Sequence, residues 1–167
     1  MRTYNDIYID ASKRLKKAGI EAASLEARLL LAYAADKTQE ELLRDIRLYP
    51  GDAVERKAEL FFERRLSGEP AAYILGEWEF CGLGFDVNPN VLIPRTDTEL
   101  LPELLLRQLE GREKPRILDL CAGSGCIGLT AAARRTDLTA VLADVDERAL
   151  IVCRRNALRH RLSPRAY

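Results

Sequence analysis

Residues 116–144 constrain the fold more than any other part of the sequence. Two short apolar runs, at 116–120 and 139–144, have the composition of buried strands, and a helical stretch ending at Arg135 lies between them. Two strands that are joined through a helix pair in parallel with a right-handed crossover, because a tight hairpin turn cannot connect them. This segment therefore predicts the start of an α/β domain with a parallel sheet.

A short loop with two glycines joins the first of these strands to the helix. Gly123 and Gly125 lack a Cβ, so the backbone N–H groups of the loop and the positive end of the helix can face a ligand closely. Asp144, at the end of the second strand, is placed to accept hydrogen bonds from the two hydroxyls of a ribose. The loop and the acid together predict a nucleoside-binding site at the carboxyl ends of the strands.

The loop by itself does not distinguish between cofactors. Residues 123–128 also fit G-x-G-x-x-G, and Asp144 follows about 20 residues later, as in a dinucleotide-binding fingerprint. Asp119 before the glycines and a helical region ahead of the first strand are arrangements common among methyltransferases, and they favour that class over a nicotinamide-dependent oxidoreductase. A strand-to-helix turn that binds no ligand is the remaining alternative.

The first 68 residues have the apolar spacing and the boundary residues of a small helical bundle. Side chains able to cap a helix N-terminus precede three of the expected helices, and these are Ser24, Thr38 with Glu41, and Asp52 with Glu55. The helix after Ser24 is expected to turn Leu25 and Tyr33 toward the core.

The period of the sequence changes after Pro70. Aromatic residues and glycines between positions 78 and 87 predict a β-hairpin. A helix is expected to begin with Thr98 as its N-cap, which puts Pro102 in the first turn, where its missing N–H costs little. Asp146 is expected to cap the last helix.

The sequence predicts two parallel strands and no third one. Because helices normally cover both faces of a parallel sheet, we expect the α/β domain to be incomplete in these 167 residues. Two open strand edges also predict low stability and association.

Composition narrows the class of protein. Lys and Arg total 26 and balance 26 Asp and Glu, so no net field directs the chain to nucleic acid or to an anionic membrane. The sequence has no apolar run of about 18 residues and no signal-like N-terminus, so we expect a cytoplasmic protein with no membrane contact. Its four cysteines form no C-x-x-C pair and only one histidine is present, which predicts reduced, mostly buried thiols and no metal site.

Three ordered motifs precede the α/β segment. They are Pro-Ala-Ala-Tyr-Ile-Leu-Gly at 70–76, Glu-Phe-Cys-Gly-Leu-Gly-Phe-Asp-Val at 79–87, and Val-Leu-Ile-Pro-Arg-Thr-Asp-Thr-Glu at 91–99. This set resembles the linker of the release-factor glutamine methyltransferases, also called the HemK or PrmC family. The resemblance covers essentially the whole chain, and it implies a helical bundle, a hairpin linker and a Rossmann-like methyltransferase domain.

The resemblance also implies an activity, which is methyl transfer from S-adenosyl-L-methionine to the side-chain amide of the Gly-Gly-Gln glutamine of peptide-chain release factors. It implies that the loop holds the methionine part of the cofactor and that the strand-end acid holds its ribose. The corresponding positions are Cys121, Ala122, Gly123, Ser124, Gly125 and Asp144. Arg95 corresponds to the family's strip beside the cofactor, or else it is an ordinary surface arginine.

Three positions or segments depart from the family pattern. Cys121 stands where the family often has glycine, which a small residue tolerates if the backbone angle there is ordinary. Thr96 stands where proline is usual. The family's Asn-Pro-Pro-Tyr motif, which holds the target amide, is absent from the 167 residues, so no catalytic residue is assigned and activity of the chain alone is not expected.

We therefore expect an α+β protein with a substrate-recognition bundle at 1–69, a hairpin linker at 70–95, and the incomplete beginning of a methyltransferase domain at 96–167. Two other functions stay open, a non-catalytic helical module that binds a release factor and a nucleic-acid amino-methyltransferase. A cluster of arginines near the C-terminus is expected to form a solvated helix face rather than an RNA contact, and its members are Arg154, Arg155, Arg159, Arg161 and Arg165.

Overall fold

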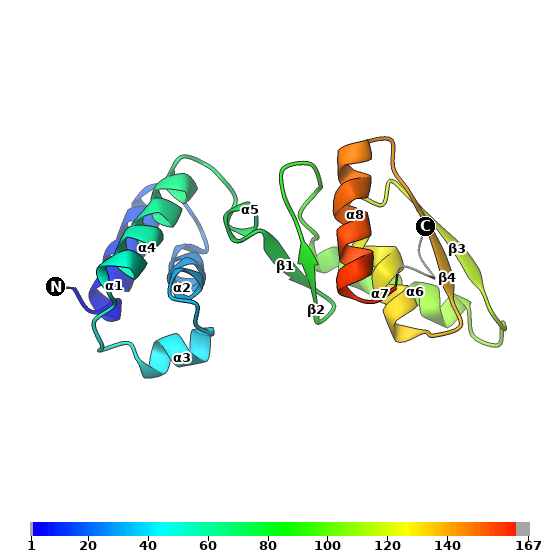
Figure 1. The fold of residues 1–167 in the computed structure, drawn as a ribbon, viewed down its shortest axis with the longest axis horizontal. Coiled ribbons are helices and arrows are strands. Elements are labelled where there is room, and N and C mark those ends of the chain that lie inside the picture. Colours follow the sequence, from blue (N-terminus) through cyan, green and yellow to red (C-terminus); the bar gives the residue numbers. More distant parts are fainter. Residues whose placement is uncertain (1, 163–167) are drawn as a thin grey trace. The chain divides into compact units, whose positions relative to one another are not determined.

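The computed structural model describes residues 2–162 and confirms the expected α+β architecture (Figure 1). The chain divides into two compact units, one at Met1–Leu75 and one that begins at Gly76. The first unit is helical, and the second combines an antiparallel hairpin, a parallel strand pair and three α-helices with a 3₁₀ turn. Among residues 2–162, no helix has the length and apolar character needed to cross a membrane.

The first unit is a bundle of short helices around an aliphatic core. Its helices are α1 (Tyr4–Lys17), α2 (Ala23–Ala34), α3 (Gln39–Arg44), α4 (Asp52–Leu66) and α5 (Ala71–Leu75). Leu15, Leu30, Leu42 and Phe62 are almost fully buried in this core. Burial of side chains of this size supplies most of the stability of a small helical unit, since helices this short are marginal by themselves.

Local capping decides some of the helix starts but not all of them. The predicted capping box at Thr38 is confirmed, because its hydroxyl accepts from the Glu41 amide at 3.1 Å and the Glu41 carboxylate accepts from the Thr38 amide at 2.8 Å. The caps predicted at Ser24 and Asp52 are wrong. Both residues lie inside their helices, which start after N-cap residues Ala22 and Gly51 that provide no side-chain hydrogen bond.

The predicted buried face of α2 is also wrong in part. Leu25 and Tyr33 are 46% and 40% exposed, while Ala27, Leu30 and Leu31 are buried. The sequence of α2 is apolar on most sides, so several stripes of residues fit a buried face equally well. The structure buries a stripe that contains alanines, which lets the neighbouring helices α1 and α4 approach closely.

The second unit begins with the predicted hairpin. Strands β1 (Glu77–Phe80) and β2 (Leu83–Asp86) pair antiparallel, with Glu77 opposite Asp86. Phe80 and Phe85 are almost fully buried and share one core with Leu129 and Leu138. The hairpin is therefore packed into the second unit through its two phenylalanines.

The remaining elements of the second unit form the predicted strand–helix–strand arrangement, preceded in sequence by one helix and followed by another. They are the 3₁₀ turn Thr96–Glu99, α6 (Leu100–Gln108), β3 (Arg116–Leu120), α7 (Cys126–Arg134), β4 (Thr139–Ala143) and α8 (Glu147–Arg159). The prediction that β3 and β4 are parallel is confirmed, with Leu118 opposite Val141. The predicted cap of α8 is confirmed too, since the Asp146 carboxylate accepts from the Arg148 amide at 2.8 Å.

Helix α6 starts differently from the prediction. Thr98 lies within the 3₁₀ turn and does not cap the helix, whose N-cap is Glu99. Pro102 is nevertheless in the first turn, as expected, and it is buried. The hydrogen-bonded 3₁₀ turn leads directly into the helix, so the proline fits in the first helical turn without a side-chain cap.

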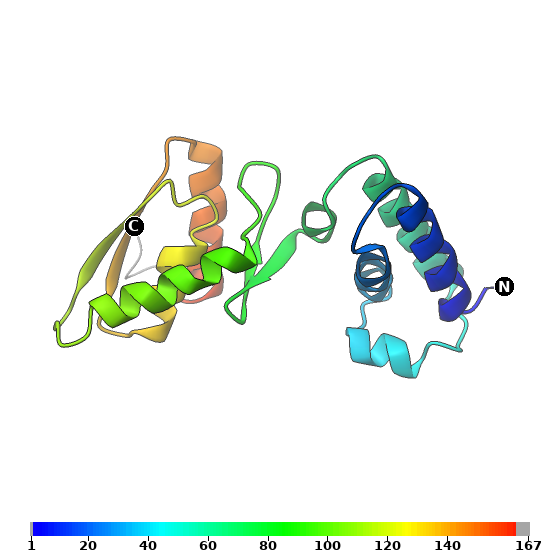
Figure 2. The same cartoon turned by 180° about the vertical axis from the view of Figure 1, so that it is seen from behind.

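Only one face of the parallel strand pair is covered in residues 2–162. Helices α6, α7 and α8 lie on the same side of β3 and β4 in both views (Figures 1 and 2), and Ala140 and Leu142 are buried on that side. On the other face, Leu118 and Leu120 are 60% and 66% exposed. The pattern of alternate burial along the strands follows from the period of two in a β-strand.

Thr38 caps its helix and Ser24 does not, and substitution of the two residues tests this difference. We expect Thr38→Ala to lower the free energy of unfolding by about 1 kcal/mol, because it removes the oxygen that accepts from an N-terminal amide of α3. Urea unfolding followed by far-UV circular dichroism measures the change. Ser24→Ala is the matched control, because the Ser24 hydroxyl meets only the exposed hydroxyl of Ser12, and it should cost less than about 0.5 kcal/mol. Equal losses in the two variants would contradict the assignment.

Candidate functional site

The loop between β3 and α7 leaves the sheet in an unusual backbone conformation. Cys121, Gly123 and Gly125 have φ angles of 60°, 54° and 80°, in the left-handed region that favours glycine. The Ala122 amide donates to the Ala143 carbonyl at 3.0 Å, which extends the ladder between β3 and β4 by one residue. The Gly125 amide then donates to the Ala122 carbonyl at 2.7 Å and closes a tight turn ahead of α7.

Two carboxylates at the ends of neighbouring strands hold this loop. Asp144, after β4, accepts from the Gly123 amide at 2.8 Å and from the Asp146 amide at 3.0 Å. Asp119, near the end of β3, accepts from the Gly128 amide at 2.9 Å. Because the carboxyl ends of parallel strands lie at the same edge of the sheet, Asp144 can reach the loop and Asp119 can reach the first turn of α7.

The environments of the two acids shift their pKa values in opposite directions. Hydrogen bonds from the Asp146 and Gly123 amides hold the pKa of Asp144 below its usual range. Burial raises the pKa of Asp119, and the negative charge of Asp144 raises it further, while the hydrogen bond from the Gly128 amide lowers it. Asp144 is thus a stable anion at neutral pH, while Asp119 is the more readily protonated of the two.

This arrangement limits the ligands that fit the loop. A dinucleotide-binding loop offers its backbone amides to a pyrophosphate at the helix N-terminus. Here the amides of Gly123 and Gly128 already donate to the protein's own carboxylates, and the Gly128 amide belongs to the first turn of α7. A pyrophosphate would meet occupied donors and two acidic side chains, whereas a neutral nucleoside or a cationic group would not be repelled.

Gly125, before α7, and Gly128, within it, each have a steric reason to lack a side chain. A Cβ on Gly125 would lie 2.7 Å from the Cys153 sulfur and 2.9 Å from Cδ1 of Leu129. A Cβ on Gly128 would lie 2.9 Å from Leu142 and 3.0 Å from the Asp119 carboxylate. Close packing between α7, β4 and α8 therefore excludes side chains at both positions.

The structure brings together most of the predicted site residues at the carboxyl ends of β3 and β4. Ala122, Ser124 and Gly125 are buried, Gly123 and Asp144 are half-buried, and Cys121 is exposed. Arg95 is exposed, and within residues 2–162 its side chain forms no hydrogen bond or ion pair. The condition for tolerating Cys121 is not met, because its backbone angle is left-handed and a Cβ there is strained.

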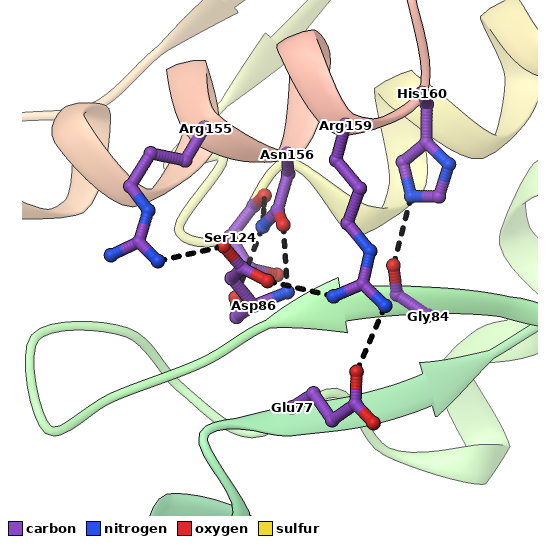
Figure 3. Close-up of polar contacts among 8 residues, drawn as sticks. All are labelled: Glu77, Gly84, Asp86, Ser124, Arg155, Asn156, Arg159 and His160. Carbon is purple, nitrogen blue, oxygen red and sulfur yellow. Dashed lines mark hydrogen bonds and ion pairs between the residues drawn. The ribbon is translucent and has the colours of Figure 1, made fainter.

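The arginines of α8 contact the hairpin, which the sequence did not predict. Arg159 forms ion pairs with Asp86 at 2.7 Å and with Glu77 at 2.8 Å, and Arg155 forms one with Asp86 at 3.0 Å (Figure 3). These two side chains thus hold acids of β1 and β2 instead of forming only a solvated face. Arg165 lies outside the described residues.

Sequence comparisons agree with this geometry. The PrmC N-terminal domain matches residues 6–76, and the Methyltransferase small domain matches residues 97–167. The second match, which includes the glycine loop and Asp144, places residues 97–167 among the methyltransferases, as the start of such a domain.

Curated relatives narrow the class to a family. Proteins named release factor glutamine methyltransferase from Neisseria gonorrhoeae, Nitratidesulfovibrio vulgaris and Clostridium botulinum are 44%, 41% and 32% identical over 133, 160 and 160 residues. These alignments cover 80%, 93% and 96% of this chain and 48%, 52% and 56% of the relatives. The chain belongs to the release factor glutamine methyltransferase family, and it spans about half the length of the curated relatives it matches.

The packing around Gly125 predicts a large cost for any side chain at that position. We expect Gly111→Ala to cost about 1 kcal/mol of stability, because Gly111 has a φ of 74° but open space around it. Gly125→Ala should cost about 1–3 kcal/mol more, because its Cβ also meets the Cys153 sulfur. Thermal and urea unfolding of both variants measure the difference. Equal costs would show that the loop yields to the added methyl group.

The four cysteines differ in burial and therefore in reactivity. Burial raises the pKa of the Cys126 and Cys153 thiols to about 11, so at pH near 8 only about one in a thousand is a thiolate. Cys121 is exposed and should account for the fast phase of labelling by a thiol reagent, with one equivalent per chain. The other thiols should react quickly only in denaturant. A fast phase that persists in Cys121→Ser would contradict this assignment.

Proposed function

We propose that this chain carries the S-adenosyl-L-methionine site of a protein that methylates peptide-chain release factors. The proposed acceptor is the side-chain amide nitrogen of the glutamine in the Gly-Gly-Gln motif. The observation that carries the proposal is that Asp144 accepts from the Gly123 amide of the glycine loop, while Asp119 accepts from the Gly128 amide in the first turn of α7. The names of the relatives support the release factor as the substrate.

The residues present fit this cofactor by their chemistry. We propose that residues 121–125 hold its methionine part, that Asp144 accepts from its ribose hydroxyls, and that Arg95 lies in the segment beside it. When bound, S-adenosyl-L-methionine would supply the methyl group of its sulfonium to an amide nitrogen, with the electron pair of the broken C–S bond left on sulfur and one proton of the amide released to water. The low pKa of Asp144 keeps it a carboxylate, the form that accepts hydrogen bonds from hydroxyls and attracts a cationic ligand.

We propose a separate role for each of three successive segments of the chain. We propose that residues 1–69 recognise the release factor, that 70–95 form the hairpin linker, and that 96–167 belong to the methyltransferase domain of a cytoplasmic protein. The sequence contains no Asn-Pro-Pro-Tyr segment, so no group among these residues is assigned to hold the acceptor amide. We accordingly propose cofactor binding for this chain and methyl transfer for the whole protein.

Calorimetric titration with S-adenosyl-L-methionine and with NADH tests the cofactor. We expect Asp144→Ala to weaken binding of S-adenosyl-L-methionine by about 10- to 100-fold, the cost of losing hydrogen bonds to a charged group. Asp137→Ala is the matched control. Asp137 lies before β4, at the opposite end of the strand, where its carboxylate accepts from the Lys114 amide at 2.9 Å, and its loss should leave affinity unchanged.

Two outcomes would overturn the proposal. Tighter binding of NADH than of S-adenosyl-L-methionine would assign the loop to a nicotinamide enzyme. The substrate is tested with the whole protein, tritium-labelled cofactor and a release factor, with a Gln→Ala change in its Gly-Gly-Gln motif as the control. Label in DNA or RNA, and none in the release factor, would favour the nucleic-acid amino-methyltransferase.

A further inference from the structure

A fully buried asparagine on α8 contacts two distant segments of the second unit. Asn156 is one of the few buried polar side chains in the described part of the chain. Its Oδ1 accepts from the Asp86 amide at 2.7 Å, and its Nδ2 donates to the Asp86 carbonyl at 3.0 Å and to the Ser124 carbonyl at 2.9 Å (Figure 3). One side chain therefore joins the end of the hairpin to the glycine loop.

The chemistry of these three bonds requires an amide side chain. Asp86 offers one backbone donor and one backbone acceptor, and Ser124 offers a second acceptor. Asparagine has an oxygen that accepts and an NH₂ group that donates twice, so it satisfies all three. A buried polar group that loses such a partner costs free energy, which makes substitution by a side chain without both functions unfavourable.

The bond to Ser124 fixes a peptide group that the two acids do not reach. The peptide between Ser124 and Gly125 is planar, so its C=O and N–H point in opposite directions. Its carbonyl accepts from Asn156, and its N–H donates to the Ala122 carbonyl. Asp144 on the Gly123 amide and Asn156 on the Ser124 carbonyl thus hold the loop, and Asp119 on the Gly128 amide holds the first turn of the helix that follows it.

The hairpin side of Asn156 is held firmly against α8. Besides the ion pairs of Arg155 and Arg159, the His160 ring nitrogen Nε2 lies 2.9 Å from the Gly84 carbonyl (Figure 3). The same ring also packs on Phe85. A Cβ on Gly84 would lie 2.8 Å from the Arg159 guanidinium, so the absence of a side chain there lets the arginine reach the hairpin acids. The hairpin thus gives Asn156 a fixed support on one side of α8.

We propose that Asn156 is a positioning residue for the cofactor, which transmits the docked position of the hairpin to the Ser124 carbonyl and so keeps the glycine loop in its binding shape. This inference rests on the proposed function, because it assigns the same loop to S-adenosyl-L-methionine. It predicts that cofactor affinity depends on a residue that makes no contact with the cofactor. It also predicts that the hairpin and the loop respond together when the cofactor binds.

The variant Asn156→Asp tests the donor group alone. It keeps the shape of the side chain and the acceptor for the Asp86 amide, but it replaces Nδ2 by an oxygen that faces two carbonyls. We expect affinity for S-adenosylhomocysteine, measured by calorimetry, to fall at least about tenfold at pH near 8. Affinity should recover as the pH is lowered to about 5, because a protonated carboxyl can donate one hydrogen bond again. Urea unfolding of the variant at both pH values is measured alongside, because protonation of a buried carboxylate also restores stability; affinity that stays low at pH about 5 after stability has recovered would overturn the inference.

Leu158→Ala is the matched control, since it shortens an exposed side chain on the same helix and should leave affinity unchanged. Hydrogen exchange of the unmodified protein provides a measurement that does not depend on folding of a variant. S-adenosylhomocysteine should slow exchange of the Gly125 amide and of the Asp86 amide together. Protection of the loop without any change at Asp86 would overturn the inference.

The failures of the inference and of the proposed function are distinguishable. If the unmodified protein binds S-adenosylhomocysteine and Asn156→Asp binds it equally well over the whole pH range, the inference fails and the proposed function stands. If the unmodified protein binds no S-adenosylhomocysteine or S-adenosyl-L-methionine, the proposed function fails and the inference falls with it.

Discussion

Backbone peptide groups in the glycine loop must find partners outside a strand or helix ladder, because left-handed angles at Gly123 and Gly125 turn them away from it. Side chains from three separate parts of the chain bind these groups and an amide in the first turn of α7. Asp119 comes from β3, Asp144 follows β4, and Asn156 comes from α8. The positions of these elements and the shape of the loop therefore depend on one another. The close packing at Gly125 and Gly128 helps to fix both.

The same contacts decide the electrostatic character of the site. A loop and helix N-terminus of this kind can receive an anion only if their amides are free, and here the protein's own carboxylates occupy one amide of the loop and one of the first helical turn. Because Asp119 is buried and close to a second acid, the edge of the sheet favours positive charge nearby. A sulfonium fits this environment better than a pyrophosphate, which is a physical reason for one cofactor class over the other within very similar sequence patterns.

Some features that depend on neighbours in sequence were predictable, although the caps at Ser24 and Asp52 were not, and features that depend on distant partners were not. The Thr38 capping box and the parallel strand pair were visible in residue spacing, and both are confirmed. The predicted buried face of α2 failed around Leu25, because an apolar helix offers several buried faces and only packing chooses among them. The hydrogen bonds of Asn156 could not be predicted, since Asp86 lies 70 residues away in sequence and an asparagine in a helix has no characteristic pattern.

The contacts between the hairpin and α8 also have a consequence for the order of folding. Hydrogen bonds from Arg159 to Glu77 and between Asn156 and Asp86 join residues that are 82 and 70 positions apart in sequence. Closing such long segments costs chain entropy, so these bonds form only after most of the second unit has assembled. In the helical unit, by contrast, α1 and α2 are adjacent in sequence and pack directly. During synthesis the bundle can form early, whereas the glycine loop acquires its final support only once α8 has left the ribosome.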